Sequence, residues 1–317
     1  EGNWRDIFQN WEALGASYPE YYEHMVARFV SASTADGFNP YRIYREGIDW
    51  ERLEPNNPFS GLGYWGDHQI IYLLRLLKGF NDYYPDKLLA ILDQSLFSYA
   101  NVPYRIAPFD AMEKDAKHTV FYDAKMDEAI SGLCAEIGTD GQLLQKDGSV
   151  YLVCLMEKLL VPALCKMANL LPGGGIWMNT QRPEWNDANN AIVGIGLSMV
   201  TVYHLRAYFA FLRELVLAAD ETYQISAEVA IWLRESAALQ ARGDAKNTGW
   251  AFLRSMGHIF DHYRERVYAN GFSGQVPVLK SELISWADGC LKLLDETIAV
   301  NRGKLFASYN LLGENRS

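Results

Sequence analysis

The sequence has no long apolar run and no excess of basic residues. No stretch of about 18 apolar residues is free of charge, so we predict no membrane span. The 29 Lys and Arg residues are outnumbered by 39 Asp and Glu, which gives a net charge of −10. A chain this acidic repels phosphate backbones and anionic lipid, so we expect neither a nucleic-acid nor a membrane partner.

Cysteine is also scarce, and none of the four is placed for metal binding. No pair forms CxxC, and no histidine lies at zinc-ligand spacing from Cys134, Cys154, Cys165 or Cys290. Three of them lie in apolar helical stretches, where buried free thiols are common. We therefore predict free thiols in a reducing, cytoplasmic compartment, with no metal site and no resident cofactor.

Helical periodicity dominates the rest of the chain. Apolar residues make up 49% of the sequence, which is enough for a large core. They recur at helical spacing in nine segments, of which the longest divides near residues 206–208, to give roughly ten helices. The segments are 20–33, 68–80, 85–99, 123–137, 151–170, 188–218, 223–241, 246–268 and 279–300. We predict one all-α domain over residues 1–317.

Long polar loops separate these helices at residues 34–66, 100–122 and 171–186. Loops of this length inside a compact domain are usually functional. Short extended pieces at 41–44 and 148–152 predict small hairpins within the connections. The chain begins EGNWRDIFQN, without Met or a signal peptide, so we interpret it as a piece of a longer chain.

Three short segments combine Trp, Asp and amide side chains at or near the start of a predicted helix. They are cluster 1 at 3–10 (NWRDIFQN), cluster 2 at 64–69 (YWGDHQ) and cluster 3 at 182–190 (RPEWNDANN). Carboxylates and amides bind hydroxyl groups, and an indole face covers the apolar side of a sugar ring. The candidate substrate-binding residues are Arg5, Asp6, Gln9, Trp65, Asp67, His68, Gln69, Arg182, Trp185 and Asn186.

Asp and Asn at a helix start are also ordinary N-caps, and the helix dipole favours a carboxylate there. A cap needs one oxygen, however, and needs neither a neighbouring Trp nor two further amides. The same composition three times therefore favours a binding site over simple capping.

Asp187 is the candidate general acid. The helix dipole lowers the pKa of a carboxyl group at this position, whereas Glu184 and burial beside Trp177 and Trp185 raise it. The sequence leaves this balance open. Glu184 is either a catalytic base or the group that raises the pKa of Asp187.

In this order, the three clusters resemble motifs of the inverting glycoside phosphorylases that act on cellobiose and chitobiose. Residues 5–10 (RDIFQN) resemble a motif of the form GFRDxxQD, and residues 66–71 (GDHQII) one of the form SDDHLWL. Residues 184–190 (EWNDANN) resemble GDWNDGMN, with Glu184 and Ala188 where that motif has Asp and Gly. The resemblance implies an (α/α)6 barrel, or a large part of one, with long decorated loops. The starts of its inner helices would converge on one funnel.

The resemblance also implies roles for single residues. Asp187 would be the general acid, and Trp185 would lie against the sugar. Arg5 and Asp6 would bind hydroxyl groups of the ring whose anomeric carbon reacts. Asp67 would contact the sugar or support a residue that does.

We therefore expect a carbohydrate-active enzyme that cleaves or forms a glycosidic bond with inversion. Phosphorolysis is favoured, with inorganic phosphate as co-substrate and an oligosaccharide or glycoside as partner. An inverting glycoside hydrolase on the same barrel and a non-catalytic helical toroid that binds a glycan or a partner protein are the alternatives. An all-α lyase or isomerase that uses Tyr64, His68 and Arg182 is a third alternative, and a homo-oligomer is left open.

Overall fold

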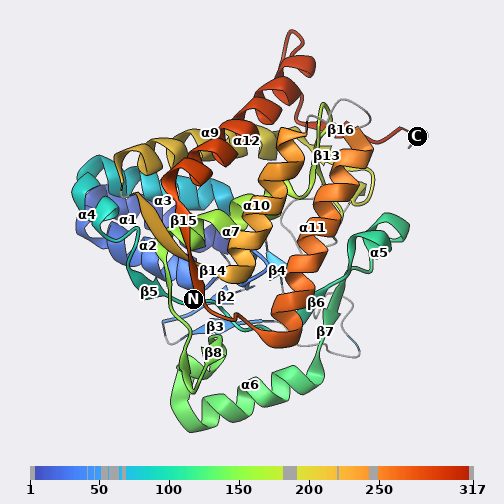
Figure 1. Cartoon of the computed structure of the whole chain (residues 1–317). Helices are drawn as coiled ribbons and strands as arrows, with labels where there is room; N and C mark the ends of the chain where they lie inside the picture. Colours follow the sequence, from blue (N-terminus) through green and yellow to red (C-terminus); the bar gives the residue numbers. More distant parts are fainter. Residues whose placement is uncertain are drawn as a thin grey trace. The chain divides into compact units, whose positions relative to one another are not determined.

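The computed structural model (Figure 1) describes residues 4–40, 42–45, 47–50, 56, 64–65, 69–180, 191–219, 221–242 and 249–313. At residues 4–6, 40, 42, 64–65 and 69 it describes the backbone alone. The chain is mostly helical with small scattered sheets, which confirms the predicted helical class. Within the described part of the chain, no helix is long and apolar enough to cross a membrane.

Two compact units make up the chain, and each is described by itself. The first contains residues 1–105 and 120–162, and the second contains 106–119 and 163–317. The single domain over 1–317 and the toroid stay predictions.

The first unit is built from helices α1 to α4 and α6, joined by short strands. The chain leaves it through β6 (Tyr104–Ile106), returns through β7 (Val120–Tyr122) and ends it in α7 (Leu155–Met167). Its other elements are α1 (Trp4–Ser17), η1 (Pro19–Tyr21), α2 (Tyr22–Ser31), β1 (Asn39–Pro40), β2 (Arg42–Ile43), β3 (Ile48–Asp49), β4 (Tyr64–Trp65), α3 (Gln69–Tyr83), α4 (Pro85–Ala90), β5 (Ser95–Phe97), α6 (Ala124–Ile137), η2 (Gly138–Gln142), β8 (Gln145–Lys146), β9 (Ser149–Val150) and β10 (Val153–Cys154).

Two aromatic layers join α1, α2 and α3. In the first layer the Phe8 ring meets Phe29 of α2 edge-on and stacks on Tyr72 of α3, with centroid distances of 4.7 and 4.4 Å. In the second layer the buried Tyr22 ring lies between Gly15 and Gly79, where any larger side chain would collide with it. Burial of one such aromatic side chain stabilises the folded state by about 1.5–3 kcal/mol.

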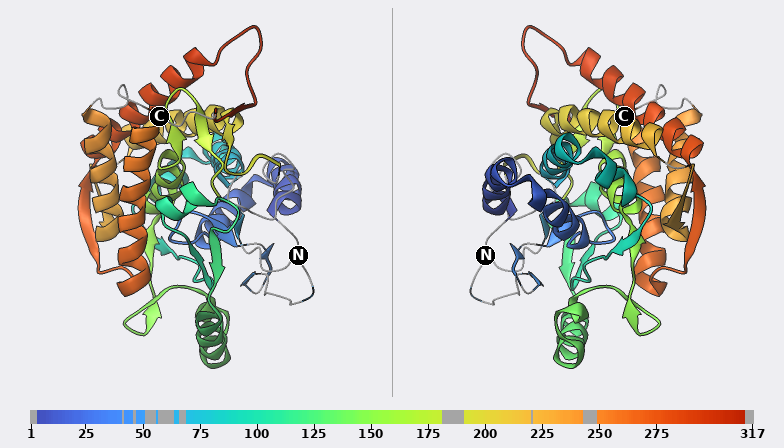
Figure 2. Two further views of the ribbon diagram at one scale, coloured as in Figure 1. Left: turned by 90° about the vertical axis from the view of Figure 1, so that its right-hand side faces the viewer. Right: turned by 90° about the vertical axis from the view of Figure 1, so that its left-hand side faces the viewer.

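The second unit is dominated by four long helices. Helices α10 and α11 lie side by side in both views of Figure 2, and α12 runs along α9. Its elements are α5 (Phe109–Lys114), β11 (Leu170–Leu171), β12 (Gly175–Trp177), β13 (Gly196–Ser198), α9 (Met199–Ala218), β14 (Thr222–Ser226), α10 (Ala227–Ala241), α11 (Gly249–Asn270), β15 (Gln275–Leu279), α12 (Lys280–Val300) and β16 (Tyr309–Leu311). Strands β14 and β15 pair antiparallel, and β11, β12, β13 and β16 form the one four-stranded sheet among the described strands.

The core of the second unit is aromatic. Trp232 of α10 is almost fully buried and stacks on Phe260 and Tyr263 of α11, with centroid distances of 4.6 and 4.4 Å. Along the other helix pair, Arg206 binds Asp295 and Arg213 binds Asp288, which shows that α9 and α12 are antiparallel. Buried rings supply most of the stabilisation here, because exposed ion pairs contribute about 0–1 kcal/mol each.

One face of α11 holds the segment from residue 106 to α5. Six side chains of α11 contact the segment in sequence, in antiparallel order. The contacts are Tyr268 Oη to Ile106 N, Arg264 to Ala107 O, Asp261 to Phe109 N, His258 to Asp110, and Arg254 and Trp250 to Glu113. Residues 106–114, which the sequence predicts to be loop, are thus an ordered strand end and short helix.

Several predicted helices are confirmed, and four need correction. The helix predicted over 151–170 is only Leu155–Met167, because residues 153–154 form β10 before it and β11 begins at Leu170 after it. Helix α4 ends at Ala90, and residues 95–97 form β5, which pairs with β10. Within 188–218, residues 196–198 form β13. Helix α9 begins after Ser198, whose side chain accepts from Thr201 N, and it continues unbroken past 206–208. Residues 222–226 form β14 before α10 begins.

The predicted hairpins and thiols are confirmed. Strands β2 and β3 pair, as do β8 and β9, at the two places where short extended pieces are predicted. All four cysteines are free, and Cys154, Cys165 and Cys290 are buried. Burial raises the pKa of the Cys154 thiol to about 12, so this thiol stays protonated at neutral pH.

Candidate functional site

Helices α1 and α3 run parallel, and successive residues of the two helices lie level with one another. Contacts between them join Phe8 to Tyr72 and Glu12 to Arg75, so the partner number rises along both helices. Residue 5 of α1 is therefore level with residue 69 of α3. The starts of two helices that lie more than sixty residues apart in sequence meet at the same end of the pair.

This arrangement brings the backbone of Gln69, the last residue of cluster 2, level with the start of cluster 1. Arg5 and Asp6 lie in the first turn of α1, and Gln69 is the first residue of α3. Gln9, one turn further along α1, is exposed. The side chains of Arg5, Asp6, Trp65 and Gln69, and all of Asp67 and His68, lie outside the described residues. Two parallel helix starts present backbone N–H groups and the positive ends of two dipoles, which favours an anion between them.

Strand β1 connects cluster 2 to a buried polar loop. Asn39 pairs with Trp65 in the β1–β4 register, so its backbone adjoins cluster 2. Its side chain is 1% exposed, and neither amide atom makes a hydrogen bond with a described residue. A buried amide without partners costs about 1–3 kcal/mol for each unmet group, so an occupant at this position would stabilise it.

The loop before Asn39 is buried along residues 32–39. It turns tightly at Gly37, whose φ of 85° favours glycine, and the Thr34 and Phe38 backbones close the turn with a 2.7 Å bond. Lys158 of α7 supports it from within, because its Nζ donates to Ser33 O at 3.2 Å. The loop is therefore rigid next to cluster 2.

Lys158 belongs to a buried charged network. Its Nζ lies 3.4 Å from the centroid of the Tyr99 ring, and Tyr99 Oη donates to Glu157 Oε1 at 2.8 Å. Burial lowers the pKa of Lys158 well below its usual range, and the Glu157 carboxylate opposes this shift. Neither Lys158 nor Asn39 was predicted from the sequence. The only signal for Lys158 was the adjacent Glu-Lys pair inside a mostly apolar helix.

Cluster 3 lies in the connection between β12 and β13 of the second unit. Residues 181–190 are outside the described residues, and with them Arg182, Glu184, Trp185, Asn186 and Asp187. The base of the connection is closed by backbone bonds from Gly194 N to Met178 O and from Met178 N to Gly196 O, at 2.6 and 2.9 Å. We call this hydrogen-bonded base, which includes residues 178, 194 and 196, the stem. Its bonds fix the two ends of the connection that contains cluster 3.

The stem also contains Trp177, which is 2% exposed. Its indole Nε1 donates to Gly194 O at 3.0 Å, and its ring meets Phe109 and Trp250 edge-on. Asn179 next to it donates to Asn169 at 2.6 Å. These partners explain Trp177 as a packing residue of the stem, and any influence on the pKa of Asp187 stays a prediction.

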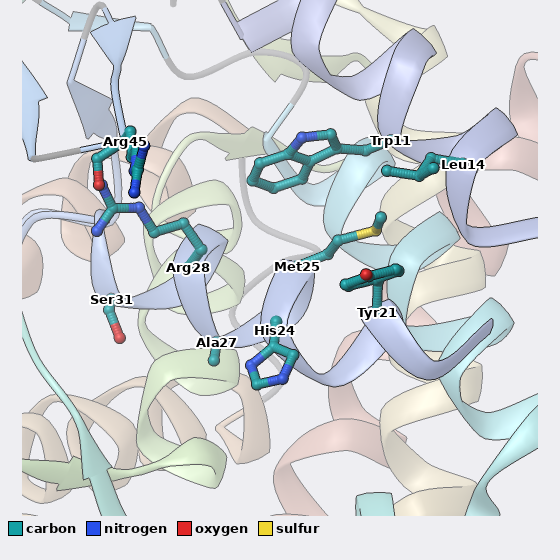
Figure 3. Close-up of a pocket in the computed structure, with 9 residues that line it drawn as sticks. All are labelled: Trp11, Leu14, Tyr21, His24, Met25, Ala27, Arg28, Ser31 and Arg45. Atoms are coloured by element: carbon teal, nitrogen blue, oxygen red, sulfur yellow. The ribbon is translucent and has the colours of Figure 1, made fainter. Parts of the chain in front are cut away.

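A groove of about 600 Å³ opens on the first unit, between α1, η1, α2 and the tip of the β2–β3 hairpin (Figure 3). The Trp11 indole and the Met25 side chain lie in its middle, with Tyr21 and Leu14 at one end and Arg28 and Arg45 at the other. Its remaining lining residues are His24, Ala27 and Ser31. None of the nine belongs to the three clusters.

Among the described residues, no group of three or more His, Cys, Asp or Glu side chains could hold a metal ion. No protein-family model matches the sequence, and no curated protein matches it either.

Proposed function

We propose that the chain is a carbohydrate-active enzyme that cleaves or forms a glycosidic bond with inversion, with phosphorolysis favoured. The parallel starts of α1 and α3 carry this proposal. They place Arg5 and Asp6 level with the start of the helix that follows Asp67 and His68. Separate clusters of polar and indole side chains at one end of a helix pair are suited to binding a ring with several hydroxyl groups.

The helix directions also support the (α/α)6 barrel. Helix α2 runs antiparallel to α1, because Phe8 meets Phe29 while Tyr22 fits against Gly15. An up-down-up order of α1, α2 and α3 is the order that successive hairpins of a helical toroid require. In such a barrel the helix starts at one end surround one funnel.

The proposed reaction uses Asp187 as general acid. Its proton goes to the glycosidic oxygen as the bond from that oxygen to the anomeric carbon breaks. A phosphate oxygen attacks the opposite face of the same carbon, which gives a sugar 1-phosphate of inverted configuration. In a hydrolase, Glu184 would instead activate a water molecule for the same attack.

Product analysis tests the reaction class. Incubation with a set of β-linked disaccharides, with and without inorganic phosphate, is followed by NMR of the anomeric proton. We expect a sugar 1-phosphate only when phosphate is present. Reducing sugar formed without phosphate would replace the proposal by a hydrolase, and no product from any substrate would favour a binding protein.

Asp187→Asn tests the general acid, because Asn caps a helix about as well as Asp does. We expect kcat to fall by roughly 10²–10⁴-fold with an unchanged melting temperature. Asp123→Asn is the matched control, since Asp123 caps α6 through Lys125 N and Met126 N and belongs to no cluster. Equal activity of Asp187→Asn and the control would show that Asp187 is only a cap.

A further inference from the structure

The groove beside α1 has the chemistry of a small-ligand site. Its volume of about 600 Å³ falls within the range of about 300–1,000 Å³ that such sites occupy. His24, Arg28 and Ser31 recur every three or four residues along α2, so they form one continuous face of that helix, and Tyr21 at the end of η1 extends this face by one step. Trp11 and Leu14 of α1 form the opposite wall.

Charge divides the groove into two ends. Arg28 and Arg45 lie together at one end, and His24 adds a third basic side chain to the lining. No carboxylate is among the described residues that line it, although the whole chain carries a net charge of −10. A local positive end on an acidic protein selects an anionic group.

The positive end is held by fixed backbone geometry. The Arg28 guanidinium donates through Nη2 to the carbonyl oxygens of Tyr44, Arg45 and Gly47. These bonds tie the hairpin tip to α2, so the Arg45 backbone is held at the mouth of the groove. The next residue of the hairpin is fixed too, because the Gln142 amide bonds both N and O of Ile48, at 3.0 and 2.7 Å.

The other end supplies flat and apolar surfaces. Tyr21 is 48% exposed and Leu14 is 42% exposed, and the Trp11 indole faces the space over Met25 (Figure 3). Indole and phenol rings offer stacking faces to a sugar ring, while His24, Ser31 and the Tyr21 hydroxyl can bind its hydroxyl groups. The groove thus separates aromatic side chains at one end from basic side chains at the other. This separation matches a ligand that has a ring and an anionic group.

We propose that this groove binds a phosphorylated sugar, with the phosphate at Arg28 and Arg45 and the sugar ring against Trp11. The site lies outside the three clusters, so it is separate from the proposed catalytic centre.

Isothermal titration calorimetry on the whole chain tests this site. The probes are glucose 6-phosphate, glucose, inorganic phosphate and AMP. Glucose 6-phosphate is chosen because a centre for phosphorolysis would take the 1-phosphate. We expect it to bind more tightly than the other three. Inorganic phosphate that binds equally well, AMP that binds more tightly, or no binding at all would each overturn the proposal.

Two variants locate the ligand. Arg45→Gln should weaken glucose 6-phosphate about tenfold, because a charge-assisted bond is lost from an exposed side chain that does not support the fold. Lys78→Gln, which removes an exposed charge from α3 outside the groove, is the matched control and should change nothing. Trp11→Leu should weaken glucose 6-phosphate and leave inorganic phosphate unchanged.

Equal affinity in wild type and Arg45→Gln would overturn the proposed site. Asp187→Asn should leave the affinity for glucose 6-phosphate unchanged. The two proposals can therefore be tested separately, because binding in the groove does not depend on Asp187 and the proposed reaction does.

Discussion

Phe8 stacks on Tyr72 across α1 and α3, with 4.4 Å between the ring centroids and an angle of 4° between the ring planes. The Glu12–Arg75 pair one turn further along keeps the same order on both helices. Because the pair is exposed, it contributes about 0–1 kcal/mol, and the rings contribute more. The aromatic contact therefore sets the parallel direction that brings cluster 1 level with cluster 2.

Gly79→Ala tests how tightly α3 fits its neighbours. A Cβ at this position would come within 2.4 Å of the Tyr22 ring, which Gly15 already confines from α1. We expect the free energy of unfolding to fall by about 1–3 kcal/mol in a denaturant titration. Gly132→Ala in α6, where a Cβ would meet nothing within 4 Å, should instead stabilise by up to about 1 kcal/mol. Equal effects of the two substitutions on the free energy of unfolding would mean that Tyr22 and α3 move apart at no cost, so the fit at Gly79 would not be tight.

Periodicity predicted the long helices because they pack one apolar face for several turns. It failed where a strand finds its partner far away in sequence. Strand β5 pairs with β10, and β13 pairs with both β12 and β16. A strand of two or three residues carries too little pattern to detect, although Gly194 with its φ of 87° marks the point where a helix cannot continue.

The helix starts beside clusters 1 and 2 were predictable from the sequence, whereas the site that they would form stays a prediction. The two helix starts of clusters 1 and 2 lie where the sequence expects them, at the start of α1 and just before α3. The buried loop at 32–39 and the Lys158 network depend on tertiary contacts, so no local pattern indicated them. Asn39 was not predicted as a site residue, because Asn followed by Pro in a polar loop is typical of a turn.

Asn39→Ala tests whether this buried amide faces a substrate. Its amide atoms bond no described residue, so their loss should leave the free energy of unfolding unchanged or raise it. If the amide binds substrate, kcat/KM on the best glycoside should fall about tenfold. The matched control is Asn179→Ala, because that buried amide bonds Asn169 and Thr180. The control should lose about 1–3 kcal/mol. An equal loss of stability in Asn39→Ala would show that its amide is a structural group.

Asp261→Asn tests the buried ion pair that anchors residues 106–114. Asp261 and Arg264 are 7% and 4% exposed, and Asp261 also accepts from Phe109 N at 2.8 Å. Removal of one charge leaves the Arg264 guanidinium buried with its charge unbalanced, which costs about 3–5 kcal/mol. Asp110→Asn, one turn away in the same contact series, removes an exposed partner of His258 and should leave the melting temperature nearly unchanged. Differential scanning calorimetry compares the two, and similar melting temperatures would mean that the buried pair contributes nothing.

Lys158 should make stability depend on pH. In the unfolded chain a lysine titrates near pH 10.4, whereas burial lowers the pKa of Lys158 in the folded chain well below this. Between the two values the unfolded chain holds a proton that the folded chain lacks. Lys158 alone therefore makes the free energy of unfolding rise with pH in that window, by up to about 1.4 kcal/mol per pH unit, and this contribution is lost as the pH falls. The buried thiols act in the opposite direction, because Cys154 keeps its proton to about pH 12 in the folded chain and loses it near pH 8.5 in the unfolded chain.

Lys158→Met should lower the slope below that of wild type by the lysine contribution, because Met cannot be protonated and its unbranched chain fits the same buried space. The buried thiols contribute equally in both proteins, so the difference between the two slopes belongs to Lys158. Urea titrations of both proteins between about pH 7 and about pH 9.5 measure it, below the range in which unfolded tyrosines lose their protons. Lys78→Met removes an exposed lysine and should keep the wild-type slope. If Lys158→Met also kept that slope, Lys158 would hold its proton in the folded chain, and Glu157 rather than burial would set its charge. Lys158 would then hold the loop beside Asn39 as a charged ammonium group that donates to Ser33 O.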